Sequence, residues 1–321
     1  MKAVRIHFLD NGDELRMEDV PAPELEAGHV LIKAQAIGLN RADLYRRRMA
    51  PEGEPEPPRI PGLDVAGVIE AVGAGVTGWS AGDPVTALVR GAYAEYSVAT
   101  AALAYRIPAG MSMTDASSLP CVFLTAWYAF QMAGLAPGQT ALIHSAGSGV
   151  GMAGIQLAKA LGARVLTSAG SDERVARGCE LGAEAGVNYS TQDVAAELLR
   201  LTDGRGVDMA LDTVGGAIFD GTLRALAEGG HIVTVGGHTG PRTAYEEQEL
   251  ERKGQWVKAM GVFNEAQADE AQAGWEKMLA WFEDGTLRTI VQEVLPWTEA
   301  TRAQELLNSR GVFGKIVMEV G

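Results

Sequence analysis

From about Thr140 onward the sequence alternates regularly between short apolar runs and longer helix-like segments. The apolar runs predict buried strands at 140–144, 163–168, 207–212 and 231–235. The segments between them predict helices at 151–161, 172–181 and 217–227. Strand–helix units of this spacing build a parallel sheet with crossover helices on both faces. The expected fold class is therefore α/β with a doubly wound sheet.

The segments on either side of this region have a different pattern. Before it, strands are expected at 30–38 and 65–72, with turn signals such as Gly82-Asp83-Pro84 after them. After about Gln267, the sequence predicts helices at 270–284 and 298–309 and a closing strand at 315–320. We therefore expect residues 123–265 to form a domain inserted into a second, mainly β domain built from residues 1–122 and 266–321.

Composition excludes several classes of function. Lys plus Arg is 27 and Asp plus Glu is 41, which gives a net charge of −14 and argues against nucleic acid or an anionic membrane as the partner. The two cysteines, Cys121 and Cys179, cannot form a disulfide framework or a four-cysteine zinc lobe. This composition is typical of a reducing compartment, so a cytoplasmic location is expected.

One apolar stretch, from Leu119 to Ala136, is nearly long enough to span a membrane. Pro120 and Gly134 interrupt it, and no Lys or Arg flanks it closely. A buried helix that leads into a cofactor pocket is the better interpretation.

A glycine-rich turn, Ser145-Ala146-Gly147-Ser148-Gly149-Val150-Gly151, lies between the first strand and the first helix of the alternating region. Aligned on its last glycine, the dinucleotide fingerprint G-x-G-x-x-G matches at Gly151 only, but the strand before and the helix after supply the required context. Backbone N–H groups and the dipole at such a helix start stabilise a pyrophosphate. We expect the cofactor's phosphates at Ala146, Gly147, Ser148, Gly149, Val150 and Gly151. The alternative is a turn that binds nothing.

The end of the second strand of that region indicates which cofactor binds. An NAD site usually has Asp or Glu there to accept hydrogen bonds from the ribose 2′-hydroxyl, but no carboxylate follows this strand before Asp172. Ser168, Ser171 and Arg174 instead offer hydroxyls and a cation to a 2′-phosphate. NADPH is therefore favoured over NADH. The competing interpretation of Arg174 is a solvated charge on a helix face.

The whole chain resembles the medium-chain dehydrogenase/reductase family. The resemblance rests on segments 38–45 and 60–69, on Gly149-Val150-Gly151 with Gln156-Leu157-Ala158-Lys159, and on Gly314-Lys315-Ile316-Val317. It implies a Rossmann nucleotide domain inserted in a GroES-like domain. The family's zinc-dependent alcohol dehydrogenases have Cys where Asn40 stands and His where Leu63 stands, so we expect no metal site.

Within that family the chain is most similar to the NADPH-dependent quinone oxidoreductases of the zeta-crystallin type. Their Asn-x-x-Asp-x-Tyr arrangement falls on Asn40, Asp43 and Tyr45. The resemblance implies that these three are the catalytic residues and that their role is positioning. The resemblance further implies that the cofactor is bound by Arg174, Tyr189 and Arg310 at its 2′-phosphate, by Thr125 at its nicotinamide, and by the loop at Gly236 and Gly237. The family usually has Lys where Arg174 stands. A homodimer joined through the edges of the nucleotide domains is also implied.

The expected chemistry agrees with the missing metal ligands. Reduction of an isolated ketone needs a metal or a strong proton donor to stabilise the alkoxide, whereas a quinone or an α,β-unsaturated carbonyl spreads the charge of the incoming hydride by conjugation. A hydrogen bond from Asn40 or Tyr45 to the acceptor oxygen would then suffice, with Asp43 holding the loop in shape and solvent supplying the proton. The sequence does not name the acceptor or decide between one- and two-electron reduction.

Two other functions remain open at this stage. One is an enoyl-thioester reductase of the same superfamily, which Tyr45 permits and the net charge of −14 disfavours unless Arg46, Arg47 and Arg48 act locally. The other is a protein that binds NADPH without turnover. Tyr45 itself is as well interpreted as a solvent-facing loop aromatic, and the acidic loop from Pro51 to Pro58 as either a cover of the substrate cleft or an ordinary surface excursion.

Overall fold

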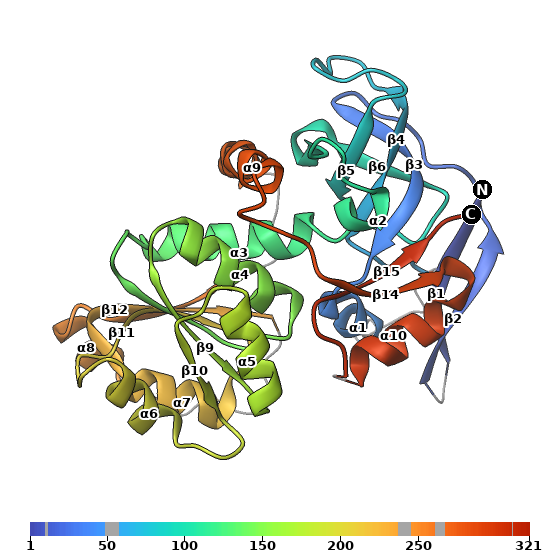
Figure 1. The fold of residues 1–321 in the computed structure, drawn as a ribbon. Coiled ribbons are helices and arrows are strands. Elements are labelled where there is room, and N and C mark those ends of the chain that lie inside the picture. The colour runs from blue at the N-terminus through green and yellow to red at the C-terminus, as the bar shows by residue number, and fades with distance from the viewer. Residues whose placement is uncertain (10–11, 49–57, 237–244, 261–266, 310) are drawn as a thin grey trace. The chain divides into compact units, whose positions relative to one another are not determined.

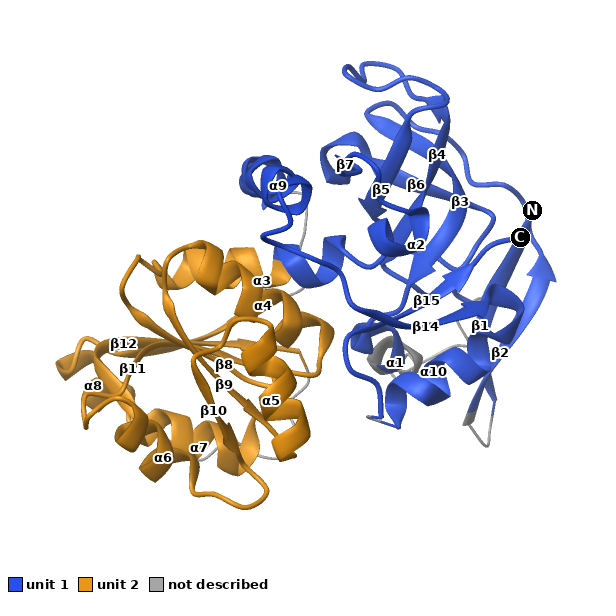
Figure 2. Cartoon of the chain, viewed as in Figure 1, with its two compact units in different colours: residues 1–124, 264–321 blue, residues 125–263 orange. Residues whose placement is uncertain are grey.

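The computed structural model describes residues 1–9, 12–48, 58–236, 245–260, 267–309 and 311–321. It divides into two compact units, which Figure 2 draws in separate colours. Unit 1 contains residues 1–124 and 264–321, and unit 2 contains residues 125–263. The boundary falls within α3 (Pro120–Ala133).

Unit 2 is built on a six-stranded sheet of order β10-β9-β8-β11-β12-β13, and its paired strands are all parallel. The strands are β8 (Thr140–Ile143), β9 (Arg164–Ala169), β10 (Ala185–Asn188), β11 (Val207–Asp212), β12 (Leu226–Val235) and β13 (Trp256–Met260). The chain first adds strands on one side of β8 and then returns to its other side, so the strand order reverses between β8 and β11. In open parallel sheets, ligands bind at the carboxyl ends of the strands at such a point.

Helices cover both faces of this sheet (Figure 1). They are α4 (Gly149–Ala160), α5 (Asp172–Glu180), α6 (Val194–Leu201), α7 (Gly216–Arg224) and the short α8 (Glu247–Arg252). Side-chain N-caps start three of them: Ser148, Ser171 and Asp193 each accept the N–H three residues ahead. The apolar core of the sheet includes Leu142, Leu166, Val187, Ala210 and Ile232, which are fully buried.

Unit 1 is mainly β. A seven-stranded sheet runs β14-β15-β3-β4-β5-β7, with β6 also paired to β3, and a separate hairpin joins β1 to β2. The strands are β1 (Lys2–Leu9), β2 (Gly12–Asp19), β3 (His29–Gly38), β4 (Asp64–Val72), β5 (Pro84–Leu88), β6 (Tyr96–Thr100), β7 (Ala104–Arg106), β14 (Val291–Pro296) and β15 (Lys315–Glu319). The segment after unit 2 therefore completes the sheet by pairing β15 antiparallel to β3.

The described part of unit 1 also contains the helices α1 (Arg41–Arg48), α2 (Met113–Ala116), α9 (Ala268–Glu283) and α10 (Ala300–Asn308), together with the first residues of α3. The helix α9 is fixed to η1 (Ala101–Leu103) and β7 by two side chains: Gln272 donates to the Ala102 and Ala104 carbonyls at 3.0 Å each, and the Trp275 indole N–H donates to the Arg106 carbonyl at 2.9 Å. The 3₁₀ turns η1 (Ala101–Leu103) and η3 (Trp297–Glu299) connect neighbouring elements.

The structure confirms the expected fold class, an α/β chain with a parallel Rossmann-type sheet and a GroES-like portion. Two local expectations were wrong. The segment after Asn40 forms α1 where only strands and turns were expected, and α7 ends at Arg224 because β12 begins at Leu226, within the predicted helix 217–227. Of the acidic loop, residues 51–57 lie outside the described part of the chain.

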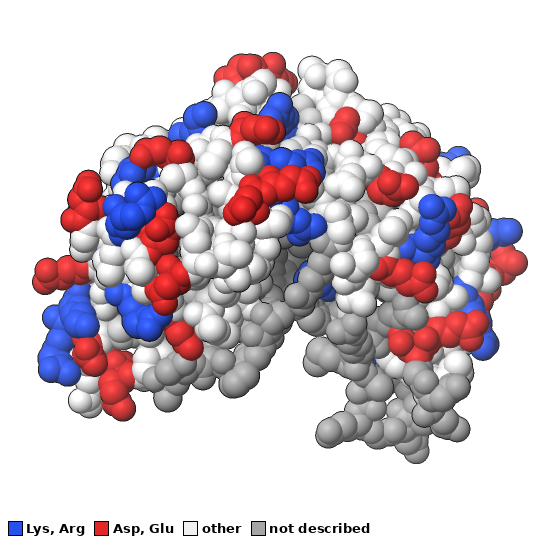
Figure 3. All heavy atoms as spheres, turned by 60° about the horizontal axis from the view of Figure 1, so that its bottom comes forward, with Lys and Arg blue, Asp and Glu red and all other residues white. Residues whose placement is uncertain are grey.

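The surface mixes charges of both signs. Figure 3 shows Lys and Arg side chains interspersed with Asp and Glu on the face that it draws. Among the described helices, none is both long and apolar enough to cross a bilayer. The apolar stretch around α3 is instead largely buried, with Phe123, Ala126 and Phe130 at 1% exposure or less.

The glycine-rich turn generates the first prediction. A Cβ atom at Gly151 would collide with the Ser145 carbonyl oxygen, so the start of α4 can approach β8 this closely only with glycine there. We expect Gly151→Ala to lower the free energy of unfolding of the chain by about 1–3 kcal/mol. Denaturant unfolding measures it. Gly311→Ala is the control, since the one described atom within 4 Å of its Cβ would be Ser309 Oγ, at 3.4 Å. Equal stability of the two variants would contradict the close approach.

Candidate active site

The helix α1 begins at a buried polar corner of unit 1. Asn40 directly precedes the helix, and its backbone N–H donates to Asp43 Oδ2 at 3.0 Å, while the Asp43 N–H donates to the Asn40 carbonyl at 2.9 Å. In this position a carboxylate satisfies an N–H that the helix itself cannot pair. Because Asp43 fixes the helix start, the Asn40 side chain is left to make contacts elsewhere.

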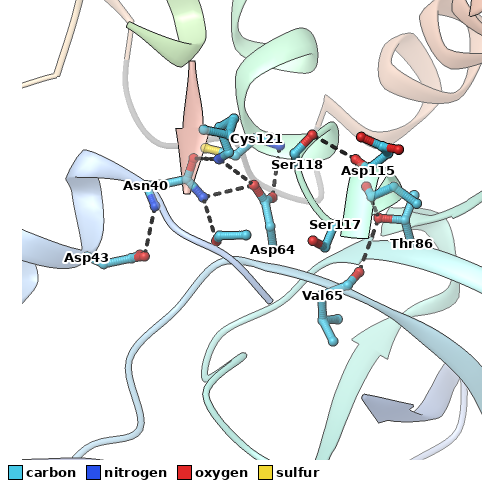
Figure 4. A network of polar contacts seen from close by, with 12 residues as sticks. Asn40, Asp43, Asp64, Val65, Thr86, Asp115, Ser117, Ser118 and Cys121 are labelled. Atoms are coloured by element: carbon cyan, nitrogen blue, oxygen red, sulfur yellow. Dashed lines mark hydrogen bonds and ion pairs between the residues drawn. The ribbon is translucent and has the colours of Figure 1, made fainter. Parts of the chain in front are cut away.

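The carboxylate of Asp64, at the first residue of β4, is the centre of those contacts. It is fully buried, and Figure 4 shows dashed lines that join it to the Asn40 side chain and to the backbone nitrogen of Cys121. Asn40 Nδ2 donates to Asp64 Oδ2 at 2.8 Å, and the Cys121 backbone N–H donates to Oδ1 at 2.9 Å. Cys121 lies in the first turn of α3, so the carboxylate also benefits from the positive end of that helix dipole.

A buried lysine completes this polar cluster. Lys315, the first residue of β15, is 2% exposed, and its Nζ donates to Asn40 Oδ1 at 2.7 Å and lies 3.4 Å from Asp64 Oδ2. We call Asn40, Asp43, Asp64 and Lys315 the polar cluster of unit 1. Asn40 directly precedes α1, Asp43 lies in α1, and Asp64 and Lys315 begin β4 and β15. These residues are far apart in the sequence and meet in the folded chain.

Burial dominates the protonation of both carboxylates. It raises the pKa of Asp43 to about 7, against the opposing effects of the Asn40 N–H, Lys315 and the Tyr93 hydroxyl, which donates to Oδ2 at 3.2 Å. Asp43 Oδ1 is buried and has no hydrogen-bond partner among the residues that the structure describes. Burial also raises the pKa of Asp64, although Lys315, Asn40 and the Cys121 N–H oppose it. The cluster thus holds two carboxylates and one ammonium, and burial favours the protonated form of both acids.

The carboxamide of Asn40 is nearly saturated with contacts. Its oxygen accepts from Lys315, and one amide hydrogen is given to Asp64. The other contact, from Nδ2 to the Gly38 carbonyl, is 3.4 Å long and therefore weak. With 5% of its surface exposed, Asn40 has one loosely held N–H for an incoming oxygen.

In unit 2 the glycine-rich turn has the geometry of an anion site. Ser145 adopts a positive φ of 56°, which is unusual for a residue with a side chain. Ser148 caps α4 by accepting the Gly151 N–H at 2.9 Å, and the first turn of this helix contains no acidic residue. Gly149 and Val150 are the first two residues of α4, where the helix itself provides no acceptor for the backbone N–H groups. A phosphate can accept from these groups. The observed residues fit a pyrophosphate.

The carboxyl end of β9 partly departs from expectation. Ser168 is fully buried, and its hydroxyl lies 2.6 Å from His144 Nδ1 inside the unit, so a direct contact with a 2′-phosphate is not supported. His144 Nε2 is 2.8 Å from the Thr222 hydroxyl, and burial lowers the pKa of this histidine. Ser168 therefore forms part of the internal support of β8 and β9.

The other residues expected at the 2′-phosphate lie close to one another. Ser171 caps α5 by accepting the Arg174 N–H at 3.4 Å, which places both at the start of that helix. Tyr189 packs over Gly170, where an added Cβ would meet its hydroxyl at 3.3 Å, and its N–H donates to the Ala169 carbonyl at 3.1 Å. Ser171, Arg174 and Tyr189 thus surround the turn that follows β9.

The remaining expected residues are spread along the chain. Ala146 is buried and donates its N–H to the Ser168 carbonyl at 3.0 Å, while Thr125 is half-buried on α3 and Gly236 follows β12 with a φ of 78°. Gly237 and Arg310 lie outside the described residues, as does the side chain of Tyr45.

Sequence reasoning missed three members of the buried site: Asp64, Lys315 and Tyr93. Asp64 and Lys315 stand in two of the segments that carry the family resemblance, yet neither segment by itself indicates a shared cluster. Lysine is among the residues least often fully buried, so sequence alone favours an exposed Lys315. The one available signal was its place between Gly314 and the apolar run 316–318.

Comparison with known proteins identifies the family. The "Zinc-binding dehydrogenase" family matches residues 149–284, and the "Alcohol dehydrogenase GroES-like domain" family matches residues 26–109. A quinone oxidoreductase of Lama guanicoe is 31% identical over 99% of this chain and 97% of its own, and that of Sus scrofa is 30% identical with the same coverage. The chain belongs to the medium-chain dehydrogenase/reductase family. It is an oxidoreductase, and its relatives place it in the quinone oxidoreductase branch.

A further relative is part of a polyketide synthase. A phenolphthiocerol/phthiocerol polyketide synthase of Mycobacterium tuberculosis is 33% identical over 73% of this chain, a match that spans 11% of the synthase polypeptide.

Solved structures agree with this assignment. A mycobacterial protein complexed with NADPH has a TM-score of 0.89 at 30% identity, and an NAD-dependent alcohol dehydrogenase has a TM-score of 0.87 at 31% identity. The Escherichia coli quinone oxidoreductase complexed with NADPH has a TM-score of 0.86 at 25% identity. Each comparison covers all of both chains.

The residues of the polar cluster do not fit the zinc ion that the first family description implies. Zinc binds deprotonated sulfur, neutral imidazole or carboxylate. Asn40 and Lys315 direct N–H groups at Asp64, and Leu63 has no ligating atom. Among the described residues, no group of three or more His, Cys, Asp or Glu side chains could hold a metal.

The raised pKa of Asp43 predicts how the free energy of unfolding depends on pH. This pKa is about 7 when folded and near 3.8 when unfolded, so the folded chain binds the proton more tightly between these values and loses stability as the pH rises. Asp43→Asn keeps an oxygen for the Asn40 N–H but removes the titration. From pH 5 to pH 8 the wild type should lose roughly 2–3 kcal/mol more unfolding free energy than the variant. Denaturant titrations at both pH values measure it, and parallel curves for the two proteins would show that Asp43 is not the titrating group.

Proposed function

We propose that this chain is an NADPH-dependent reductase that transfers hydride to quinones or other α,β-unsaturated carbonyls without a metal. The observation that carries the proposal is the polar cluster, in which an ammonium and a carboxamide stand among residues where related zinc enzymes have ligands. The reaction must then be one that needs little stabilisation of a full alkoxide.

Conjugated acceptors meet that requirement. When a hydride adds to a quinone or an enone, the negative charge is delocalised onto a distant oxygen, which a hydrogen-bond donor can stabilise without a Lewis acid. Asn40 is the proposed donor, through the amide hydrogen that is only weakly held by the Gly38 carbonyl. Tyr45 is proposed as a second contact, and Asp43 as the residue that keeps α1 and Asn40 in position. Solvent supplies the proton that completes the reduction.

The residues of unit 2 fit NADPH as the cofactor. The start of α4 would hold its pyrophosphate, and Ser171, Arg174 and Tyr189 would hold its 2′-phosphate. We retain Thr125, Gly236, Gly237 and Arg310 as further proposed contacts. When bound, NADPH supplies a hydride from C4 of its nicotinamide. The two NADPH-complexed structural relatives support this choice, and the NAD-dependent relative makes it one to test.

A second candidate is the reduction of an enoyl thioester. The similarity to a segment of a polyketide synthase favours it, since polyketide chains are carried as thioesters. The chemistry at the polar cluster would be the same, because an enoyl thioester is also a conjugated carbonyl. The two candidates differ only in the group attached to the carbonyl.

A homodimer is proposed through the outer edge of β13. This strand is the last in the sheet of unit 2 as far as the structure describes it, and an exposed strand edge presents backbone groups that a second copy can pair.

Turnover is the direct test of the function. We expect the purified chain to oxidise NADPH in the presence of 1,4-benzoquinone or 9,10-phenanthrenequinone. The loss of the nicotinamide absorbance of NADPH measures this oxidation. Crotonyl thioesters in the same assay test the second candidate, and cyclohexanone is the unconjugated control that should not react. Cofactor binding with no oxidation by any conjugated acceptor would favour a non-catalytic NADPH-binding protein.

Arg174 tests the cofactor assignment. Arg174→Glu places a carboxylate beside the proposed 2′-phosphate, so the KM for NADPH should rise by about 10-fold or more while the KM for NADH changes little. Arg177→Glu makes the same charge change one turn later on α5 and serves as the matched control. Equal effects of Arg174→Glu on both cofactors would remove the basis for NADPH preference.

A further inference from the structure

We propose that Lys315 is a positioning residue of the active site. Its buried ammonium polarises the Asn40 carboxamide, pairs with the Asp64 carboxylate, and supplies a fixed positive charge at the polar cluster. This inference rests on the proposed function, because it assigns how Asn40 becomes an effective donor to the acceptor oxygen.

The backbone holds the lysine in register with Asn40. The strand β15 pairs with β3 through Val317 and Gly38, and the Leu39 N–H donates to the Ile316 carbonyl at 3.0 Å. At the other side, the Lys315 N–H donates to the Ile290 carbonyl at 2.8 Å. Backbone hydrogen bonds between strands therefore flank both residues. They fix the backbone positions from which Lys315 Nζ donates to Asn40 Oδ1 at 2.7 Å.

The burial of this charge is costly and therefore informative. An ammonium that is 2% exposed gives up hydration that two contacts repay only partly. A methionine of similar length would fill the same space without that cost. The charge is explained if the site uses it, as pairs at functional sites often do.

Polarisation follows from the order of the contacts. Lys315 donates to the Asn40 oxygen, which draws electron density from the amide nitrogen and makes both Nδ2 hydrogens better donors. Asp64 takes one of these hydrogens at 2.8 Å and so fixes the plane of the carboxamide. The remaining hydrogen, directed to Gly38 at 3.4 Å, is the one offered to the acceptor. Lys315 would thereby act on the reaction without touching the substrate.

Three variants separate this role from a purely structural one. Lys315→Met removes the charge and leaves Asp64 without its cation. Lys315→Met with Asp64→Asn removes both charges and so restores neutrality. Lys253→Met is the control, since this lysine is 53% exposed and its ammonium lies 3.0 Å from the exposed Glu249 on α8.

Thermal unfolding tests the charge pairing independently of turnover. The ionisable groups around Asp64 are Asp43 of α1, Tyr93, Cys121 of α3 and Lys315 of β15. Without Lys315, Asp64 holds a proton more tightly when folded, so Lys315→Met should be destabilised more at pH 8 than at pH 5. The double variant should lose that added pH dependence.

Kinetics test the positioning role. In Lys315→Met and in the double variant, kcat with a conjugated acceptor should fall about 10- to 100-fold while the dissociation constant for NADPH stays within about twofold. The primary isotope effect with C4-deuterated NADPH should increase, because hydride transfer becomes rate-limiting. A loss of folded protein lowers kcat without changing that isotope effect. The decrease should be larger for an enone than for a more electron-poor quinone.

The outcomes are distinguishable. A double variant that regains both stability and wild-type kcat overturns the inference and leaves the proposed function intact, since Lys315 would then only balance Asp64. A wild-type protein that turns over no conjugated acceptor overturns the proposed function and the inference with it. A slow, stable double variant with a raised isotope effect supports both.

Discussion

The contact between the Lys315 ammonium and the Asn40 carboxamide, with Asp64 as their shared acceptor, organises unit 1. It joins the strand that closes the sheet to the residue before α1 and to the first residue of β4. Asp64 also accepts the first-turn N–H of Cys121, so α3 starts at the same point. Segments far apart in the sequence therefore meet through one buried carboxylate.

Electrostatics link this structural role to the chemistry. Two buried carboxylates face one ammonium, and burial raises the pKa of Asp43 to about 7. A site of this composition already has its cation fixed by the chain, and the Asn40 amide is its loosely held N–H donor. It suits an acceptor that delocalises charge, and it does not suit a divalent metal that needs several anionic or neutral ligands.

The sequence was a good guide where periodicity was strong and a poor one where tertiary contacts decide. The alternation after Thr140 predicted β8, β9, β11 and their helices because each run must be buried between crossover helices. The helix α1 was missed because its arginine-rich sequence lacks an apolar stripe, and its start depends on Asp43. Ser168 could not be oriented from sequence, since its partner His144 directly follows β8, the strand next to β9. Lys315 was overlooked because lysine is rarely buried.

We propose that the positive charge at this site is a lysine of the chain and not a bound ion. The most direct measurement is the metal content of the purified, active protein, determined by elemental analysis and paired with turnover before and after treatment with a strong chelator. We predict well under one zinc per chain, on the order of background, and unchanged turnover. One zinc per chain, lost together with activity on chelation and regained with both on adding zinc back, would contradict the claim.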